Sequence, residues 1–242
     1  MEIKKSVVLI SGGSLGIGKA IAKLLVDLGA EVIITGRNQK TLELAAIETG
    51  AFALCADVSK PADVELTFKI LMEKFTKLDV LINNAGIGFG RKPIEEIDLE
   101  EFYHVFNVNV FGAFLMTQKA SKIFKKQNYG NLINIGSTAS FDAYEGGGVY
   151  VSSKFALRGL TKCWQLELSK SNVRVFLVNP ENVTTAWGKM NRLEREENSN
   201  ELRGKDVASI IVSLLEMDER AFIPDVIVSS LSTFKNNTYL FS

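Results

Sequence analysis

The sequence contains few of the residues that build metal sites and disulfides. It has one histidine, His104, and two cysteines, Cys55 and Cys163, which lie far apart and form no Cys-x-x-Cys pair. Zinc sites and disulfide frameworks need more of these residues at closer spacing, so neither is indicated and no metal is expected. We expect both cysteines to be buried, reduced thiols, as in other cytosolic proteins.

Long apolar runs and an excess of charge of one sign are also missing. No apolar stretch approaches the roughly 20 residues of a membrane span, and Val7–Ile10, which follows Lys4 and Lys5, is too short for a signal peptide. The 28 basic residues are matched by 28 acidic ones, which gives no electrostatic reason to bind nucleic acid or an anionic membrane. These absences predict a soluble, cytoplasmic protein whose partner is a small molecule.

The size and composition fit one well-filled globular domain over residues 1–242, since 46% of the residues are hydrophobic and only four are prolines. No repeat, low-complexity tract or linker divides the chain. The one clear shift in composition spans Lys189 to Lys205, where charged and amide residues crowd together. This segment is either a solvated surface element or a substrate lid over residues 186–205.

Short apolar runs rich in β-branched residues alternate with longer segments of helical periodicity. That rhythm is typical of repeated βα units, and it predicts an α/β fold with a doubly wound parallel sheet of about seven strands and helices on both faces. The expected strands are Val7–Ser11, Glu31–Thr35, Ala51–Cys55, Val80–Asn83, Asn131–Ile135, Val173–Val178 and Ala221–Val228.

A glycine-rich loop follows the first expected strand. The string Ser11–Gly18 places glycines at G-x-x-x-G-x-G spacing and leads directly into an amphipathic helix. Glycine lets a backbone turn tightly and approach phosphate groups, while the N–H groups of the helix face the negative charge. A glycine string alone is weak evidence, but its strand-loop-helix context favours the pyrophosphate cradle of a Rossmann-type dinucleotide-binding domain.

The end of the second expected strand indicates which dinucleotide binds. Dinucleotide sites that bind NAD usually have an Asp or Glu there to hold the adenosine ribose, whereas this sequence has Gly36 followed by Arg37. A guanidinium binds a 2′-phosphate and no carboxylate repels it, which favours NADP over NAD. The alternative is that Arg37 is a solvated surface residue, and Leu15 supplies no second basic group within the loop.

Ser137, Tyr150 and Lys154 form a set suited to carbonyl chemistry. Ser137 closes an apolar run, and Tyr150 and Lys154 follow in the string Tyr-Val-Ser-Ser-Lys. Residues i and i+4 share one helix face, so an ammonium would lie beside the phenol and favour the phenolate, lowering its pKa. The phenol could then exchange protons near neutral pH while Ser137 holds the substrate oxygen. A hydride must come from a cofactor.

With these motifs in order, the chain resembles the short-chain dehydrogenase/reductase family over nearly its full length. Further matching segments are Asp57-Val58, Asn83-Asn84-Ala85-Gly86, Asn109 within Val108–Gly112, and Asn179–Thr185. The resemblance implies the following cofactor contacts: Gly12, Ser14, Leu15, Gly16, Ile17, Gly18, Arg37, Asp57, Val58, Asn84, Ala85, Gly86, Tyr150, Lys154, Pro180, Val183 and Thr185.

The same resemblance implies the catalytic roles. Tyr150 acts as general acid and base, Lys154 holds the nicotinamide ribose and lowers the tyrosine pKa, and Ser137 orients the substrate oxygen. Asn109 supports a water in the proton relay; the other reading is a core amide that needs a buried partner, since an unpaired one costs on the order of 1–3 kcal/mol.

Two departures from the family pattern bear on the substrate. Glu181 replaces a usual glycine, and its carboxylate either faces substrate or lid or is solvated. Phe222–Val228 lacks the Asp-Gly-Gly that often follows the last strand in fatty-acid-synthesis reductases, and is more similar to NADP-dependent carbonyl or hydroxy-acid reductases. The pocket residues expected from the sequence are Phe141, Tyr144, Glu145, Glu181 and Trp187.

The leading hypothesis is therefore an oxidoreductase that transfers a hydride between NADP(H) and a small carbonyl/alcohol pair. The alternatives are an NAD-dependent alcohol dehydrogenase of the same family and a non-catalytic dinucleotide-binding sensor or scaffold. By analogy with the family we expect a homodimer or homotetramer formed through helices within Leu99–Lys126 and Tyr150–Ser169. Candidate contacts are Phe102, Phe106, Phe111 and Phe114.

Overall fold

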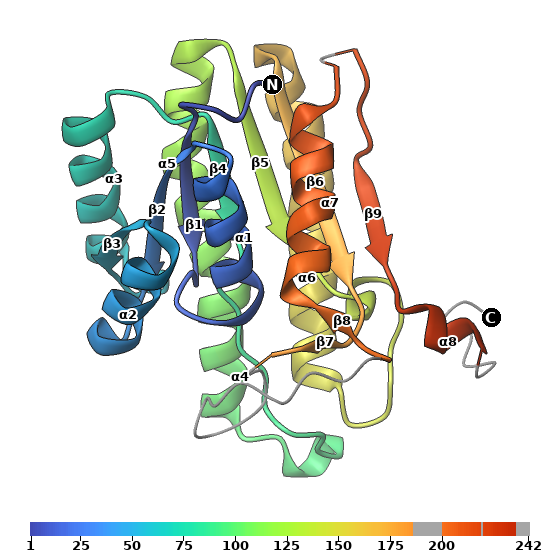
Figure 1. The fold of residues 1–242 in the computed structure, drawn as a ribbon. Coiled ribbons are helices and arrows are strands. Elements are labelled where there is room, and N and C mark those ends of the chain that lie inside the picture. The colour runs from blue at the N-terminus through green and yellow to red at the C-terminus, as the bar shows by residue number, and fades with distance from the viewer. Residues whose placement is uncertain (186–199, 219, 236–242) are drawn as a thin grey trace.

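The fold is a single Rossmann-type domain, seen in a computed structural model that describes residues 1–185, 200–218 and 220–235 (Figure 1). Its main sheet has seven strands, all parallel, in the order β3-β2-β1-β4-β5-β6-β9. This confirms the fold class and the strands expected from the sequence. The strands are β1 (Val7–Ser11), β2 (Glu31–Gly36), β3 (Phe52–Cys55), β4 (Val80–Asn83), β5 (Gly130–Ile135), β6 (Val173–Pro180) and β9 (Asp225–Val228).

Helices cover both faces of the sheet, which is why the central strands β1, β4 and β5 are buried at every position. Val8, Leu9 and Ile10 of β1 are fully buried, Val8 and Ile10 in one core cluster and Leu9 in the other, because successive side chains point to opposite faces. Helices α1, α2 and α7 pack on the first face and α3, α5 and α6 on the second. The helices are α1 (Gly16–Asp27), α2 (Gln39–Thr49), α3 (Pro61–Phe75), α4 (Leu99–Phe106), α5 (Ala113–Gln127), α6 (Gly148–Leu168), α7 (Gly204–Glu216) and α8 (Leu231–Lys235).

Two local features lie outside what the sequence pattern predicts. The helix expected within Leu99–Lys126 is divided into α4 and α5 by π-helical turns over Asn107–Gly112. A Cβ at Gly112 would lie 2.7 Å from Cγ2 of Val58, so the widened turns pack directly on the loop after β3. A small second sheet pairs β7 (Val183–Thr184) with β8 (Leu202–Arg203). The lid expected over 186–205 lies mostly outside the described residues.

The expectation that the two cysteines are buried is wrong, because both are free and exposed. Cys55 ends β3, which lies at the edge of the sheet and is paired only with β2. Cys163 lies on the outer face of α6, near Leu166, which is 75% exposed. Among the described helices, none is long and apolar enough to cross a membrane.

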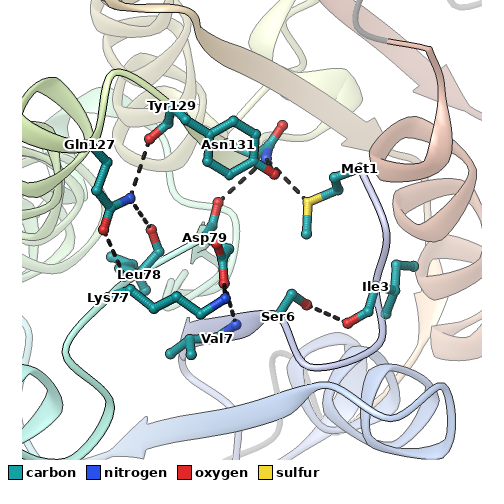
Figure 2. Close-up of polar contacts among 10 residues, drawn as sticks. All are labelled: Met1, Ile3, Ser6, Val7, Lys77, Leu78, Asp79, Gln127, Tyr129 and Asn131. Carbon is teal, nitrogen blue, oxygen red and sulfur yellow. Dashed lines mark hydrogen bonds and ion pairs between the residues drawn. The ribbon is translucent and has the colours of Figure 1, made fainter.

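At the amino ends of β1, β4 and β5, a polar network ties the first residues of the chain to the sheet (Figure 2). The Asp79 carboxylate accepts a 2.7 Å hydrogen bond from the Val7 N–H and pairs with the Lys77 ammonium at 2.7 Å. The Asn131 amide donates to the Asp79 carbonyl and to Sδ of Met1. This network lies at the amino ends of the strands, whereas the candidate site lies at their carboxyl ends.

We expect Asp79→Ala to lower the free energy of unfolding by about 1–3 kcal/mol, because it leaves the buried Val7 N–H without its acceptor. NADPH affinity is expected to stay unchanged, since the network is remote from the carboxyl ends of the strands. Chemical denaturation measures the first quantity and fluorescence titration the second. Asp218→Ala is the matched control, because it removes an exposed carboxylate whose ion pair with Arg220 is screened by solvent and contributes little to stability. Equal losses in the two variants would contradict the prediction.

Candidate active site

The candidate site lies at the carboxyl ends of the parallel strands. The chain winds outward from β1 through β2 and β3, then returns to β4 on the other side of β1. A doubly wound sheet opens a crevice at this switch point, where ligands bind. The glycine loop leaves β1 there, Asn84 follows β4, and Ser137 follows β5, so the structure brings the predicted motifs to one edge.

The side chains of Ser137 and Tyr150 lie close enough for the Ser137 hydroxyl to act on the pKa of the Tyr150 phenol. Ser137 begins a 3₁₀ turn just after β5, where its hydroxyl accepts a 3.2 Å hydrogen bond from the Ala139 N–H. Tyr150 lies in the first turn of α6. A substrate oxygen placed between the two hydroxyls would therefore meet both of them.

Lys154 lies one helical turn beyond Tyr150, as the sequence spacing predicts, and its ammonium is 5.7 Å from the centroid of the Tyr150 ring. The side chain is buried, and it donates a 2.8 Å hydrogen bond to the Ile135 carbonyl at the end of β5. Burial lowers the pKa of Lys154 from its ordinary value to about 8. The residue therefore titrates close to neutral pH.

The expectation that Lys154 lowers the pKa of Tyr150 is not met in this structure. Burial raises the pKa of the Tyr150 phenol, the hydrogen bond with Ser137 offsets only part of that rise, and the nearby Tyr144 raises it further. The Lys154 ammonium is turned toward the Ile135 carbonyl, and desolvation of the phenol outweighs its attraction. Additional positive charge beside the phenol is needed to make it a base.

Because Lys154 has a lower pKa in the folded than in the unfolded chain, its burial contributes a pH-dependent term to stability. The unfolded chain binds the proton up to about pH 10.4, so between about pH 8 and that value stability rises with pH. We compare the free energies of unfolding of wild type and Lys154→Met. From about pH 7 to about pH 10, we expect the value for wild type to rise relative to that of the variant by up to about 3 kcal/mol. Urea denaturation at both pH values gives the difference between the two proteins; a constant difference would contradict the assignment.

Asn109 is buried in the π-helical turns and all its polar groups contact the protein. Its amide donates to the Ile87 carbonyl at 2.9 Å and to Oγ of Ser153 at 3.0 Å, and its oxygen accepts from the Ile87 N–H at 2.8 Å. The side chain thus joins the loop after β4 to the helix that carries Tyr150. The sequence left two interpretations of Asn109 open. These contacts agree with the one in which it is a core amide with buried partners.

The glycine loop has the shape of a phosphate cradle. Gly12 has φ +68°, and a Cβ there would lie 2.8 Å from Cα of Ala85. A Cβ at Gly18 would lie 2.4 Å from the Gly12 carbonyl oxygen, so only glycine fits at either position. Asn84 holds the loop to β4 by donating to the Gly12 carbonyl at 2.8 Å. Leu15 precedes α1 without a side-chain cap, which leaves the first N–H groups of the helix for an anion.

Arg37 lies directly after β2, beside the glycine loop. A Cβ on Gly36 would lie 2.7 Å from Oγ of Ser14, so the end of β2 and the glycine loop adjoin. The Arg37 guanidinium is exposed and 3.5 Å from Nε2 of His104. Burial raises the pKa of Asp57, but hydrogen bonds from Ser59 and the charge of Arg37 outweigh it and lower that pKa overall. Val58 is buried against Gly112.

The other end of the crevice is formed by the segment after β6. Thr185 is buried, and its side chain adjoins Gly16, where an added Cβ would lie 3.0 Å from it. Glu181 accepts hydrogen bonds from the Ser230 N–H at 3.1 Å and the Thr233 hydroxyl at 2.6 Å, which ties α8 to the end of β6. The sequence left open whether the Glu181 carboxylate contacts substrate or is solvated. In the structure it does neither, because it anchors the C-terminal segment.

A pocket beside Tyr150 is lined by residues that the sequence pattern only partly identifies. Of the expected residues, Tyr144 lines it, Glu145 lines the adjoining groove, Phe141 packs under the Arg158 guanidinium, and Trp187 lies outside the described residues. The loop after β4 carries no sequence signal for its contribution. The lining residues missed are Phe89, Gly90, Arg91, Lys92, Ile97, Glu101, Gly146, Gly147 and Val149.

A seven-stranded, doubly wound parallel sheet with a glycine loop at its switch point is the architecture of Rossmann-type dinucleotide-binding proteins. Within that class, the chain belongs to the short-chain dehydrogenase/reductase family of oxidoreductases, because the family model described as short chain dehydrogenase matches residues 6–196. It is also 30% identical over 235 residues to the NADP-dependent 3-hydroxy acid dehydrogenase of Schizosaccharomyces pombe, and the match covers 91% of each protein.

Solved structures of similar proteins agree with this assignment. An alcohol dehydrogenase from Thermococcus sibiricus complexed with 5-hydroxy-NADP superposes with a TM-score of 0.84 and 29% identity, covering 94% of this chain and 97% of that one. A 3-ketoacyl-(acyl-carrier-protein) reductase from Brucella melitensis complexed with NADH gives a TM-score of 0.86 and 30% identity, covering 93% and 97%. Similar folds thus hold either nicotinamide dinucleotide.

Proposed function

We propose that the protein transfers a hydride between NADP(H) and a small-molecule carbonyl/alcohol pair, with Tyr150 as general acid and base. The observation that carries the proposal is the proximity of the Tyr150 and Ser137 hydroxyls, with Lys154 one helical turn on, at the ends of the strands that also hold the glycine cradle. A proton donor, a second hydroxyl and a cation are then assembled beside the place where a nicotinamide would lie.

In this proposal the bound cofactor supplies or accepts the hydride. During reduction the Ser137 hydroxyl donates a hydrogen bond to the carbonyl oxygen, and Tyr150 gives its proton to that oxygen as negative charge develops there. During oxidation Tyr150 takes the alcohol proton. Lys154, whose pKa of about 8 leaves it largely protonated at neutral pH, binds the nicotinamide ribose. Asn109 holds α6 against the loop after β4.

The cofactor contacts that we propose for this chain are those that the family resemblance implies. Arg37 binds the 2′-phosphate and so favours NADP, and Asp57 and Val58 lie near the adenine. The remaining contacts run from the pyrophosphate to the nicotinamide carboxamide: Gly12, Ser14, Leu15, Gly16, Ile17, Gly18, Asn84, Ala85, Gly86, Tyr150, Lys154, Pro180, Val183 and Thr185. Residues 1–242 would then form one dinucleotide-binding and catalytic domain.

The test is NADPH oxidation, followed by nicotinamide absorbance, with a panel of short ketones, aldehydes and oxo acids. The similar proteins are named for a 3-hydroxy acid, an alcohol and a 3-ketoacyl-(acyl-carrier-protein). The panel therefore has to span these classes of substrate. Turnover with NADPH and weak turnover with NADH is the expected result. Turnover with NADH alone would instead indicate an NAD-dependent alcohol dehydrogenase, and binding without any turnover a sensor or scaffold.

We also propose a homodimer or homotetramer formed through α4, α5 and α6. Phe111 and Phe114 are 53% and 38% exposed and Phe155 is 42% exposed, whereas Phe102 and Phe106 stack on each other with centroids 4.8 Å apart. Light scattering should give a mass of at least twice 26.7 kDa, and Phe111→Asp combined with Phe155→Asp should lower it to one chain. Ile47→Asp, on α2 and 80% exposed, is the control. A monomeric wild type would refute the proposal.

A further inference from the structure

Arg91 is an exposed residue that lines the pocket containing Tyr150, and its backbone is joined to the opposite side of that pocket. The loop after β4 is joined to the loop before α6 by a 3.1 Å hydrogen bond from the Lys92 N–H to the Gly146 carbonyl. Gly146 has φ +75°, and a Cβ there would lie 2.8 Å from Cβ of Arg91. The absence of a side chain at Gly146 lets the two loops pack closely.

The guanidinium of Arg91 lies beside the reacting groups. It is 4.8 Å from the centroid of the Tyr144 ring, and Tyr144 is near enough to Tyr150 to raise the pKa of its phenol. All three side chains line the same pocket. Stacking on an aromatic ring fixes the plane of a guanidinium and leaves its N–H edge open to an acceptor. The Tyr144 ring therefore connects the Arg91 guanidinium to the Tyr150 phenol, which is proposed to protonate the substrate.

Within the part of the chain that the structure describes, Arg91 has no acidic partner. Lys92 also lines the pocket, but its ammonium pairs with the Glu101 carboxylate at 2.7 Å. Glu101 is the only acidic lining residue among those described, and no described carboxylate lies within ion-pair distance of Arg91. One positive charge of the pocket is therefore unbalanced, and a carboxylate is the anion whose two oxygens match the guanidinium fork.

We propose that Arg91 binds a carboxylate of the substrate, so that the enzyme acts on short oxo acids and the corresponding hydroxy acids. This rests on the proposed function, since it names the substrate class of the same site. The hydride adds to the ketone or aldehyde carbon and the Tyr150 proton to its oxygen, while the carboxylate remains unchanged and fixes which carbonyl is presented. Uniform binding of this kind acts mainly through KM.

The experiment compares each acid with its own methyl ester, which keeps the reacting ketone and removes the charge. The probes are 3-oxobutanoate and 4-oxopentanoate and their methyl esters, reduced with NADPH. Wild type should prefer the acids. Arg91→Gln should raise KM for the acids and lower their kcat/KM by about 10- to 100-fold, with the esters changed by about twofold or less. Arg91→Lys should recover part of the loss.

Arg158→Gln is the matched control, because Arg158 also stacks on an aromatic ring, Phe141 at 4.0 Å, but does not line the pocket. It should change neither acid nor ester kinetics. Equal losses for acids and esters in Arg91→Gln would overturn the proposal and reduce Arg91 to a support for Tyr144, as would a wild type that prefers the esters. If wild type binds NADPH but reduces no neutral ketone, aldehyde or acid of the panel, the proposed function fails as well.

Discussion

Replacing Tyr150 by phenylalanine is expected to lower kcat for NADPH-dependent reduction by about 10²- to 10⁴-fold, the usual contribution of a positioned proton donor. The variant keeps the ring that packs in the first turn of α6 and loses only the hydroxyl that lies near Ser137. NADPH affinity should fall by about tenfold or less, because only one neutral hydrogen bond to the cofactor is lost. Kinetics at saturating NADPH measure the first quantity, and a nicotinamide fluorescence titration measures the second.

Tyr144→Phe is the control for this variant, because it removes one phenol hydroxyl from the same pocket. The Tyr144 ring and its contact with Arg91 remain, so only a neutral hydrogen bond is at stake, which corresponds to about tenfold or less in rate. If Tyr150→Phe retained wild-type turnover, or lost no more than Tyr144→Phe, Tyr150 would not be the general acid.

The relative positions of Tyr150, Lys154 and Ser137 could be predicted because they depend on local geometry. Tyr150 and Lys154 are separated by one helical turn, and Ser137 follows a buried strand whose end must lie at the edge where parallel strands open. The strands were predictable for a similar reason. Val8, Leu9 and Ile10 are apolar without alternation, and only a sheet covered on both faces buries such a run.

What the sequence did not show depends on contacts between distant segments. Arg91 acquires its position from Gly146, and Glu181 from Ser230 and Thr233, and neither pairing leaves a periodic signal. The effect of Lys154 on Tyr150 also failed as a prediction. Spacing placed the two side chains correctly, but the pKa of the phenol depends on desolvation, which a linear pattern does not report.

The cofactor preference should reverse in Arg37→Glu. In wild type the Arg37 guanidinium lies beside Nε2 of His104, and its charge helps to lower the pKa of Asp57. It is an exposed cation that a 2′-phosphate can approach from solvent. A charge-assisted contact to phosphate corresponds to about 10- to 100-fold in Kd, and we expect wild type to bind NADPH more tightly than NADH by that factor. A carboxylate at position 37 would repel the 2′-phosphate and accept hydrogen bonds from the ribose hydroxyls of NADH.

Titrations with NADPH and NADH, each followed by nicotinamide fluorescence, give the two Kd values whose ratio decides the matter. Lys40→Glu makes the same change in net charge on the exposed surface of α2, and it should alter the affinities for both cofactors alike. A reversal confined to Arg37→Glu therefore reports a local contact with the 2′-phosphate and not the overall charge of the protein. If wild type binds NADH more tightly, or if the two variants behave alike, Arg37 lies outside the cofactor site and the exposed guanidinium beside His104 is a surface group.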